Sequence, residues 1–203
     1  MEAWTALIGR HTDSPEAEDV GRRLLASWRE PHRRYHAVCH LRDILARVEE
    51  LSALAEDPDA VRLAAWYHDS VYAGLPDDEE RSARRSEQEL SGLGVAPALV
   101  DEVARLVRLT VNHDPAPGDR NGEVLSDADL SALAVSPEHY QSNSAAILEE
   151  YRHIPVDVLR KGRLQVLAAL LGSPGVFRTE PGRRRWETAA RDNMLAEMAQ
   201  LSK

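Results

Sequence analysis

Apolar residues recur along this chain at helical rather than alternating spacing. Three stripes show this most clearly. The first consists of Leu41, Ile44, Leu45, Val48 and Leu51, and the others lie within residues 99–110 and 186–201. Residues three or four apart share one face of a helix, so each stripe predicts an amphipathic helix. Further helices are predicted over 16–29, 59–73, 79–93, 127–134, 138–153 and 156–172.

The positions of proline, glycine and asparagine agree with these predicted helices. Most prolines fall between the periodic segments or in a first helical turn, where proline is tolerated. Residues 113–123, HDPAPGDRNGE, are predicted to form a loop because they are rich in proline, glycine and Asn-Gly. Internal repeats and runs of β-branched residues are missing from the sequence. We therefore expect an all-α fold of about seven to nine helices in one domain, residues 1–203.

Composition narrows the class of protein. Apolar residues make up 43% of the chain and charged residues 29%, a balance that predicts a soluble globular protein without a membrane partner. The net charge of -9 disfavours general nucleic-acid binding, although a metal ion and a few arginines could still attract a small anion. Cys39 is the only cysteine, and residues 1–11 do not resemble a secretion signal. Both features favour the cytoplasm.

Two segments carry histidines in patterns that could bind a metal. His36 and His40 are four residues apart, so on a helix they would project from one face, as paired surface histidines also do. His68 and Asp69 are adjacent within an apolar segment that is predicted to be a buried helix. Burying both polar groups without partners would cost several kcal/mol. A metal ion would compensate for that cost, and hydrogen bonds to other buried groups are the alternative.

A third segment, VLSDADLSALA, contains two aspartates near a predicted helix start. Ser126 or Asp127 would make a good N-cap, so a capping role is expected for the first carboxylate. Asp129 lies further inside the predicted helix and is less needed as a cap. It is therefore the preferred metal ligand of the pair, and Asp127 is the second choice.

The order of these segments resembles the HD superfamily of metal-dependent phosphohydrolases. The resemblance rests on YHAVCH at 35–40, His-Asp at 68–69 and Ala-Asp-Leu at 128–130. It is closest to the uncharacterised bacterial branch of predicted metal-dependent HD phosphohydrolases, through DEERSA and a later EY...GR pattern. This wider likeness covers residues 4–197. It implies an HD-domain-like helical bundle with its core motifs within 33–134.

The same resemblance implies a ligand set and a reaction. His40, His68, Asp69 and Asp129 would hold one divalent ion, such as Mn, Fe, Co, Ni, Zn or Mg. His36 and Asp69 would be catalytic, His36 by protonating the leaving oxygen and Asp69 by orienting the nucleophile. The implied reaction is attack of a metal-activated water on the phosphorus of a small phosphorylated substrate, for example a nucleotide. The chain is expected to act as a monomer or a homodimer.

Five further residues could contact phosphate or support the ligands: His113, Arg33, Arg34, Glu79 and Ser82. Each also has a structural explanation. His113 could end a helix, the paired arginines could be solvated, and acids in the DEERSA segment could complement a helix dipole. Two other functions compete with hydrolysis. One is a nucleotide-binding regulatory HD module without turnover, and the other is an iron-dependent HD-type oxygenase, which would need more histidines.

Overall fold

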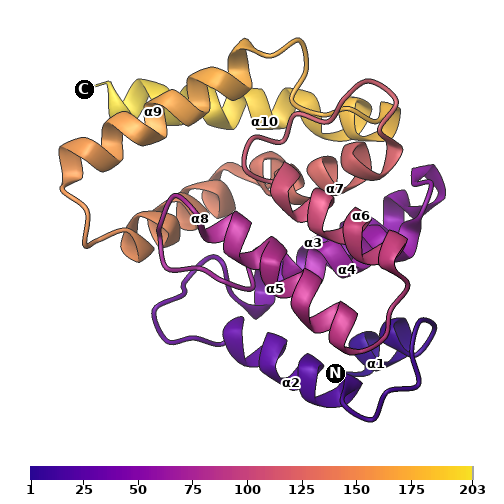
Figure 1. The fold of residues 1–203 in the computed structure, drawn as a ribbon. Helices are drawn as coiled ribbons and strands as arrows, with labels where there is room; N and C mark the ends of the chain where they lie inside the picture. The colour runs from indigo at the N-terminus through magenta and orange to yellow at the C-terminus, as the bar shows by residue number, and fades with distance from the viewer. Residues whose placement is uncertain (203) are drawn as a thin grey trace.

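The computed structural model describes residues 1–202, which form helices and connecting loops without a strand (Figure 1). The all-α prediction is confirmed. Two short 3₁₀ helices, η1 (Ser52–Leu54) and η2 (Ser131–Ala134), follow the ends of α3 and α7. The α-helices of the described residues are α1 (Glu2–Ile8), α2 (Ala17–Ser27), α3 (Val38–Leu51), α4 (Pro58–Tyr67), α5 (Asp78–Gly92), α6 (Pro97–Leu109), α7 (Arg120–Leu130), α8 (Pro137–Glu150), α9 (Val156–Gly172) and α10 (Glu180–Leu201).

The prediction of seven to nine helices was one helix short, since residues 1–202 contain ten. The additional element is α1, which has only seven residues and is too short to show a helical period. Trp4 anchors it. The Trp4 side chain is fully buried, lies edge-on to Trp66 at 5.5 Å between ring centroids, and donates its indole N–H to the carbonyl of Ala17.

Local sequence explains where several helices begin. The carboxylate of Asp57 accepts hydrogen bonds from two amides in the first turn of α4, and the side chains of Asp119 and Ser136 each accept from one amide in the first turn of α7 and α8. Proline occupies the first helical position of α4, α6 and α8, where its missing N–H has no intrahelical partner to lose. The prediction that these prolines lie in a first helical turn is confirmed.

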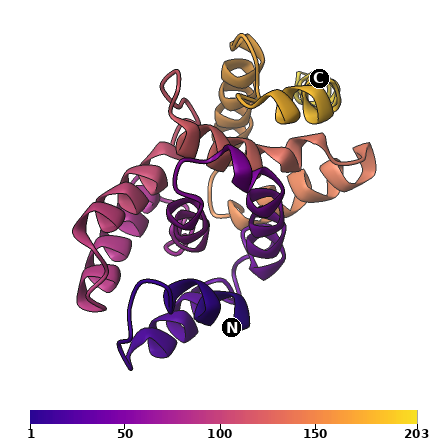
Figure 2. The ribbon, with the colours of Figure 1, turned by 90° about the vertical axis from the view of Figure 1, so that its right-hand side faces the viewer.

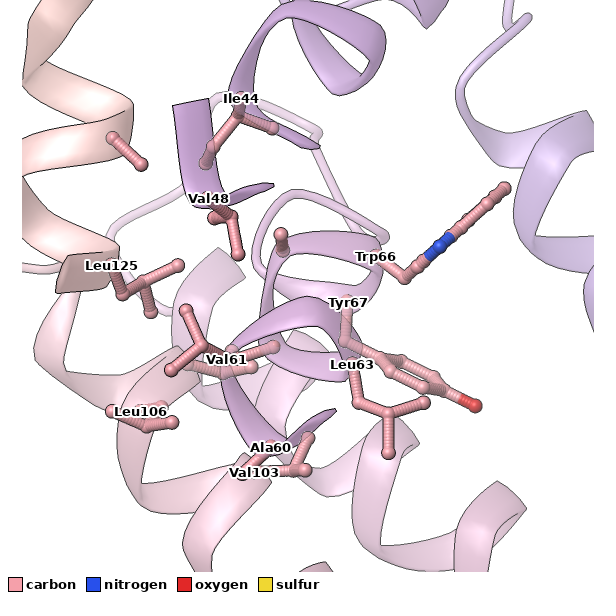
Figure 3. Close-up of a cluster of buried hydrophobic side chains, with 14 of the residues drawn as sticks. Ile44, Val48, Ala60, Val61, Leu63, Trp66, Tyr67, Val103, Leu106 and Leu125 are labelled. Atoms are coloured by element: carbon pink, nitrogen blue, oxygen red, sulfur yellow. The ribbon is translucent and has the colours of Figure 1, made fainter. Parts of the chain in front are cut away.

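α4 is the central helix. It packs against α1, α3, α5, α6 and α7, and seven of its ten residues, all hydrophobic, are buried. Figure 3 shows Val61, Leu63 and Tyr67 of α4 among side chains of its neighbours, including Val48 and Leu125. Three small alanines of α4 are fully buried and let the neighbouring helices approach closely. The C-terminal end of α4 therefore delivers the next residues, His68 and Asp69, into the interior.

The first two and the last two helices lie at opposite ends of the molecule (Figures 1 and 2). α1 and α2 lie at one end, and α9 and α10 lie together at the other, as both views show (Figures 1 and 2). α8 buries only Tyr140, and α9 buries only Leu167. Within residues 1–202, no helix combines the length and the apolar character that crossing a membrane requires.

Candidate functional site

His68 follows the last residue of α4 rather than lying within the helix. The predicted helix over 59–73 is therefore too long, because α4 stops at Tyr67 and the chain turns, with the amide of Ser70 donating to the carbonyl of Tyr67. The turn points His68 and Asp69 toward the same space. Nδ1 of His68 lies 3.0 Å from the carbonyl of Ala65. A carbonyl only accepts, so Nδ1 carries a proton and Nε2 is the nitrogen that faces the site.

Three predicted ligands come together around that nitrogen. Nε2 of His68 lies 3.3 Å from Nε2 of His40 and 3.1 Å from a carboxylate oxygen of Asp69, and the His40–Asp69 distance is 3.8 Å. One donor atom from each residue lies within 4.8 Å of the others, a spacing that could hold a metal ion. We call His40, His68 and Asp69 the HHD cluster. Its members come from α3 and from the turn after α4.

The fourth predicted ligand approaches the HHD cluster from α7. Oδ1 of Asp129 lies 3.2 Å from Nε2 of His40, and Oδ2 lies 3.5 Å from Nε2 of His113. His113 has a left-handed backbone with φ 51°, an unfavourable conformation for histidine, and its Nδ1 is buried without a hydrogen-bond partner. His113 thus combines a left-handed backbone with a buried, unpaired nitrogen beside Asp129.

Burial and charge determine the protonation of the site. The side chains of His40 and His68 are 5% and 2% exposed. Burial disfavours the charged form of His68, but the Asp69 carboxylate outweighs it and raises the pKa of His68 to about 9. Burial would raise the pKa of Asp69 and of Asp129, yet the surrounding imidazoles hold both pKa values well below the usual range. The site therefore contains two ionised carboxylates that face imidazole nitrogens.

His36 lies outside the helix that carries His40. α3 begins at Val38, and Ala37 has an extended backbone, so the expectation that both histidines share a helix face is wrong. The chain nevertheless brings the two imidazoles together, with ring centroids 5.8 Å apart. Nδ1 of His36 lies 2.7 Å from a carboxylate oxygen of Glu150 at the end of α8. His36 thus borders the HHD cluster without belonging to it.

Asp127 has a structural role, but a different one from the predicted cap. α7 begins at Arg120, so Asp127 lies in its last turns, and Asp119 is the cap. The fully buried carboxylate of Asp127 accepts from the amides of Arg178 and Thr179, at 2.7 and 2.8 Å, and from the Thr179 hydroxyl at 2.7 Å. These bonds tie α7 to the segment that precedes α10. They direct this carboxylate to a different partner from that of Asp129.

The two arginines of the RRYH segment contact the protein's own backbone. The side chain of Arg33 is fully buried and lies over the ring of Tyr72, so the expectation of a solvated side chain is wrong for this residue. Its Nη1 donates to the carbonyl oxygens of His36 and Asp69, at 3.1 and 2.7 Å. Arg34 donates from Nη1 to the carbonyl oxygens of Pro31 and Arg33. Arg33 thus links the two segments that carry His36 and Asp69.

The DEERSA residues support the loop that follows Asp69. The fully buried hydroxyl of Ser82 lies 3.0 Å from the amide and 3.3 Å from the carbonyl of Val71. Glu79 lies in the first turn of α5, where a carboxylate complements the helix dipole. Burial raises the pKa of Glu79, and the nearby negative charge of Asp69 adds to that effect. Ser82 therefore holds the loop in place, and Glu79 adds negative charge near the HHD cluster.

A cleft of about 390 Å³ opens beside His40 and Asp129. Its walls also include Arg34, Arg47 and Asn143, so cationic and amide groups line the space next to these two residues. Its size suits a small molecule rather than a polymer. The lining also includes the carboxylates of Asp43 and Asp129, and Arg47 forms an ion pair with Glu50, so charges of both signs meet in this cleft.

Glu150 is the site residue that was not identified from single side chains. It lies 110 residues after His40 in the sequence, on a helix with little buried surface. The only sequence signal was the Glu-Tyr pair of the EY...GR resemblance, which carries no chemical assignment. Comparisons with known protein families, with curated proteins and with solved structures found no match to this chain.

Proposed function

We propose that this chain is a metal-dependent hydrolase of a small phosphate ester and a distant member of the HD superfamily. The observation that carries the proposal is the HHD cluster, with Asp129 beside it, at the wall of a cleft that contains arginines. Residues far apart in the sequence supply these groups, and their order is the order that the resemblance requires.

The donor chemistry fits one divalent ion. His40, His68, Asp69 and Asp129 would hold it, since two imidazoles and two carboxylates are common ligands of Mn, Fe, Co, Ni and Zn. Nε2 of His68 points toward the centre of the cluster, where a bound cation would replace its proton, and both carboxylates are ionised. A bound divalent ion would act as a Lewis acid on a phosphoryl oxygen and lower the pKa of water, which is the chemistry that hydrolysis needs.

The protein's own residues supply the remaining roles. Arg34 and Arg47 line the cleft and would attract the phosphate of the substrate. Asp69 would orient the attacking water through its carboxylate. His36 borders the HHD cluster, and its Nδ1 is held by Glu150, so Nε2 would donate a proton to the leaving oxygen. A nucleotide is one substrate of suitable size and charge.

Metal binding and turnover can be measured separately. The chelated protein would be reloaded with each of six divalent ions and assayed on nucleotides, cyclic dinucleotides and simple phosphate esters. We expect His68→Ala to lose both the bound metal and activity, whereas His36→Ala should keep the metal and lose roughly 10²- to 10⁴-fold in kcat. His139→Ala removes an exposed histidine and is the matched control.

Each competing function predicts a different result. A wild-type protein that binds metal and nucleotide without turnover would favour a regulatory module. Two irons per chain after anaerobic purification would favour an oxygenase. A wild-type protein that binds none of the six ions would refute the proposed function.

A further inference from the structure

Glu150 occupies an unusual environment for a carboxylate at the end of a surface helix. Its side chain is 1% exposed, whereas the side chain of the preceding residue, Glu149, is 50% exposed. An unpaired carboxylate so deeply buried would be strongly destabilising. The surrounding donors must therefore compensate for the lost hydration.

Five donors surround its two oxygens. Oε1 accepts from three consecutive backbone amides, those of Arg34, Tyr35 and His36, at 2.5, 2.8 and 3.0 Å. Oε2 lies 2.7 Å from Nδ1 of His36 and accepts from the hydroxyl of Tyr72 at 3.1 Å. One carboxylate thus holds both the backbone and the imidazole of His36.

These contacts leave the His36 ring little freedom to rotate. The ring of Tyr72 stacks on it, with centroids 4.2 Å apart and planes 29° apart, and Tyr35 meets it edge-on at 4.8 Å. The carbonyl of His36 is held by Arg33, which also holds the carbonyl of Asp69. The imidazole is therefore fixed relative to the HHD cluster. Because Glu150 accepts at Nδ1, only Nε2 is left to exchange a proton with a substrate.

We propose that Glu150 is a positioning residue, which accepts from Nδ1–H of His36 and fixes the orientation of the ring, so that the Nε2 proton of the imidazolium can pass to the leaving oxygen and leave the neutral Nδ1–H form. This inference rests on the proposed function, in which His36 protonates the leaving oxygen. The role also explains why the Glu150 side chain is buried although α8 lies at the surface and otherwise contributes only Tyr140 to the buried residues. The carboxylate attaches α8 to the site directly.

The decisive variant is Glu150→Gln, which keeps the shape of the side chain and removes its charge. Glu149→Gln is the matched control, since it makes the same change at the exposed neighbour whose partner is Arg152. The first readout is the ring Nδ1–H resonance of His36 by NMR. We expect a slowly exchanging, downfield signal in the wild type and in Glu149→Gln, and a shifted or absent signal in Glu150→Gln. Circular dichroism would verify that each variant is folded.

The second readout is the dependence of kcat on the leaving group. A 4-nitrophenyl phosphate ester leaves readily without an acid, whereas a matched alkyl ester needs one. Glu150→Gln should lose roughly tenfold or more in kcat on the alkyl ester, with little change on the nitrophenyl ester and unchanged metal content. In a His36→Ala background the same substitution should have no further effect.

The outcomes separate the two proposals. An unchanged His36 resonance in Glu150→Gln would overturn the positioning role, whatever the activity. Equal losses on both esters, or additive losses with His36→Ala, would also overturn it. A wild type that hydrolyses no ester, combined with a changed resonance in Glu150→Gln, would refute the proposed function while leaving the attachment of His36 to Glu150 established.

Discussion

Asp127 and Asp129 lie two residues apart in α7, yet their carboxylates have different partners. Asp127 accepts three hydrogen bonds from Arg178 and Thr179, whereas Asp129 lies against His40 and His113. Successive residues of a helix point about 100° apart, so residues two apart diverge by roughly 200°. The contrast between the two aspartates can be tested directly.

Asp127→Asn should lower the free energy of unfolding by roughly 1–3 kcal/mol, because a neutral amide cannot replace a carboxylate that accepts from three donors. It should retain metal binding. Asp129→Asn should instead weaken metal binding, since it removes a charged ligand. Chemical denaturation and metal titration of both variants would test this. Loss of metal in Asp127→Asn with no change in stability would contradict the assignment.

Glu150 also predicts how stability depends on pH. Burial alone would raise its pKa, but the His36 imidazole and the backbone amides outweigh burial and lower the pKa of Glu150 to about 2. A carboxyl group with a lower pKa in the folded state stabilises the protein above its ordinary pKa of 4.5. That contribution, roughly 3 kcal/mol, is lost as the pH falls from 4.5 toward 2.

Urea denaturation at about pH 6 and about pH 3 would measure this contribution. The wild type and Glu149→Gln should lose more stability between the two pH values than Glu150→Gln does. The reason is that glutamine cannot take up the proton. Identical pH dependence in all three proteins would show that Glu150 is not stabilised in the folded state.

At the scale of elements, α1 depends on close contact with α2. A Cβ atom added at Gly21 would lie 2.2 Å from Cδ1 of Trp4, the residue that anchors α1 against α4. Trp4 is fully buried and cannot move aside without disturbing Trp66. Only glycine therefore fits at position 21, where α2 packs against α1.

Gly21→Ala should destabilise the protein by roughly 1–3 kcal/mol through overpacking. Gly92→Ala is the control. An added Cβ there meets nothing within 4 Å, so alanine should be neutral or stabilising by about 0.5–1 kcal/mol. Thermal unfolding of both variants would measure the difference. Equal melting temperatures would show that α1 does not need the close contact.

At the scale of the whole molecule, a metal ion would join α3, the turn after α4 and α7. A ligand that binds only the folded state stabilises it by about 2.7 kcal/mol at 100 times its Kd. For a protein of this size that corresponds to roughly 5–10 °C in Tm. The shift should appear on adding a divalent ion to the chelated wild type.

Asp69→Asn should abolish the increase in Tm, whereas Asp127→Asn should keep it from a lower starting value. Differential scanning calorimetry with and without the ion would measure both. A full shift in Asp69→Asn would exclude this residue as a ligand.

The sequence alone determined the helical class and the three core stripes, and it pointed to His40, His68, Asp69 and Asp129, which the structure brings together. Helical periodicity is a local signal, and every residue of the stripe in α3 lies in the core or packs against it. The motif order identified the members of the HHD cluster before their distances were known. These features depend on residues that are close in sequence or distinctive in type.

Only the tertiary structure decided where helices end and which distant groups meet. α4 stops at Tyr67, Asp127 binds a segment 51 residues away, and Glu150 binds His36 across 114 residues. Hydrogen bonds between distant segments leave no periodic trace in a sequence, because they require only one suitable side chain at each end. The types of residue at the site follow from the sequence, and their orientation follows from the packing around α4.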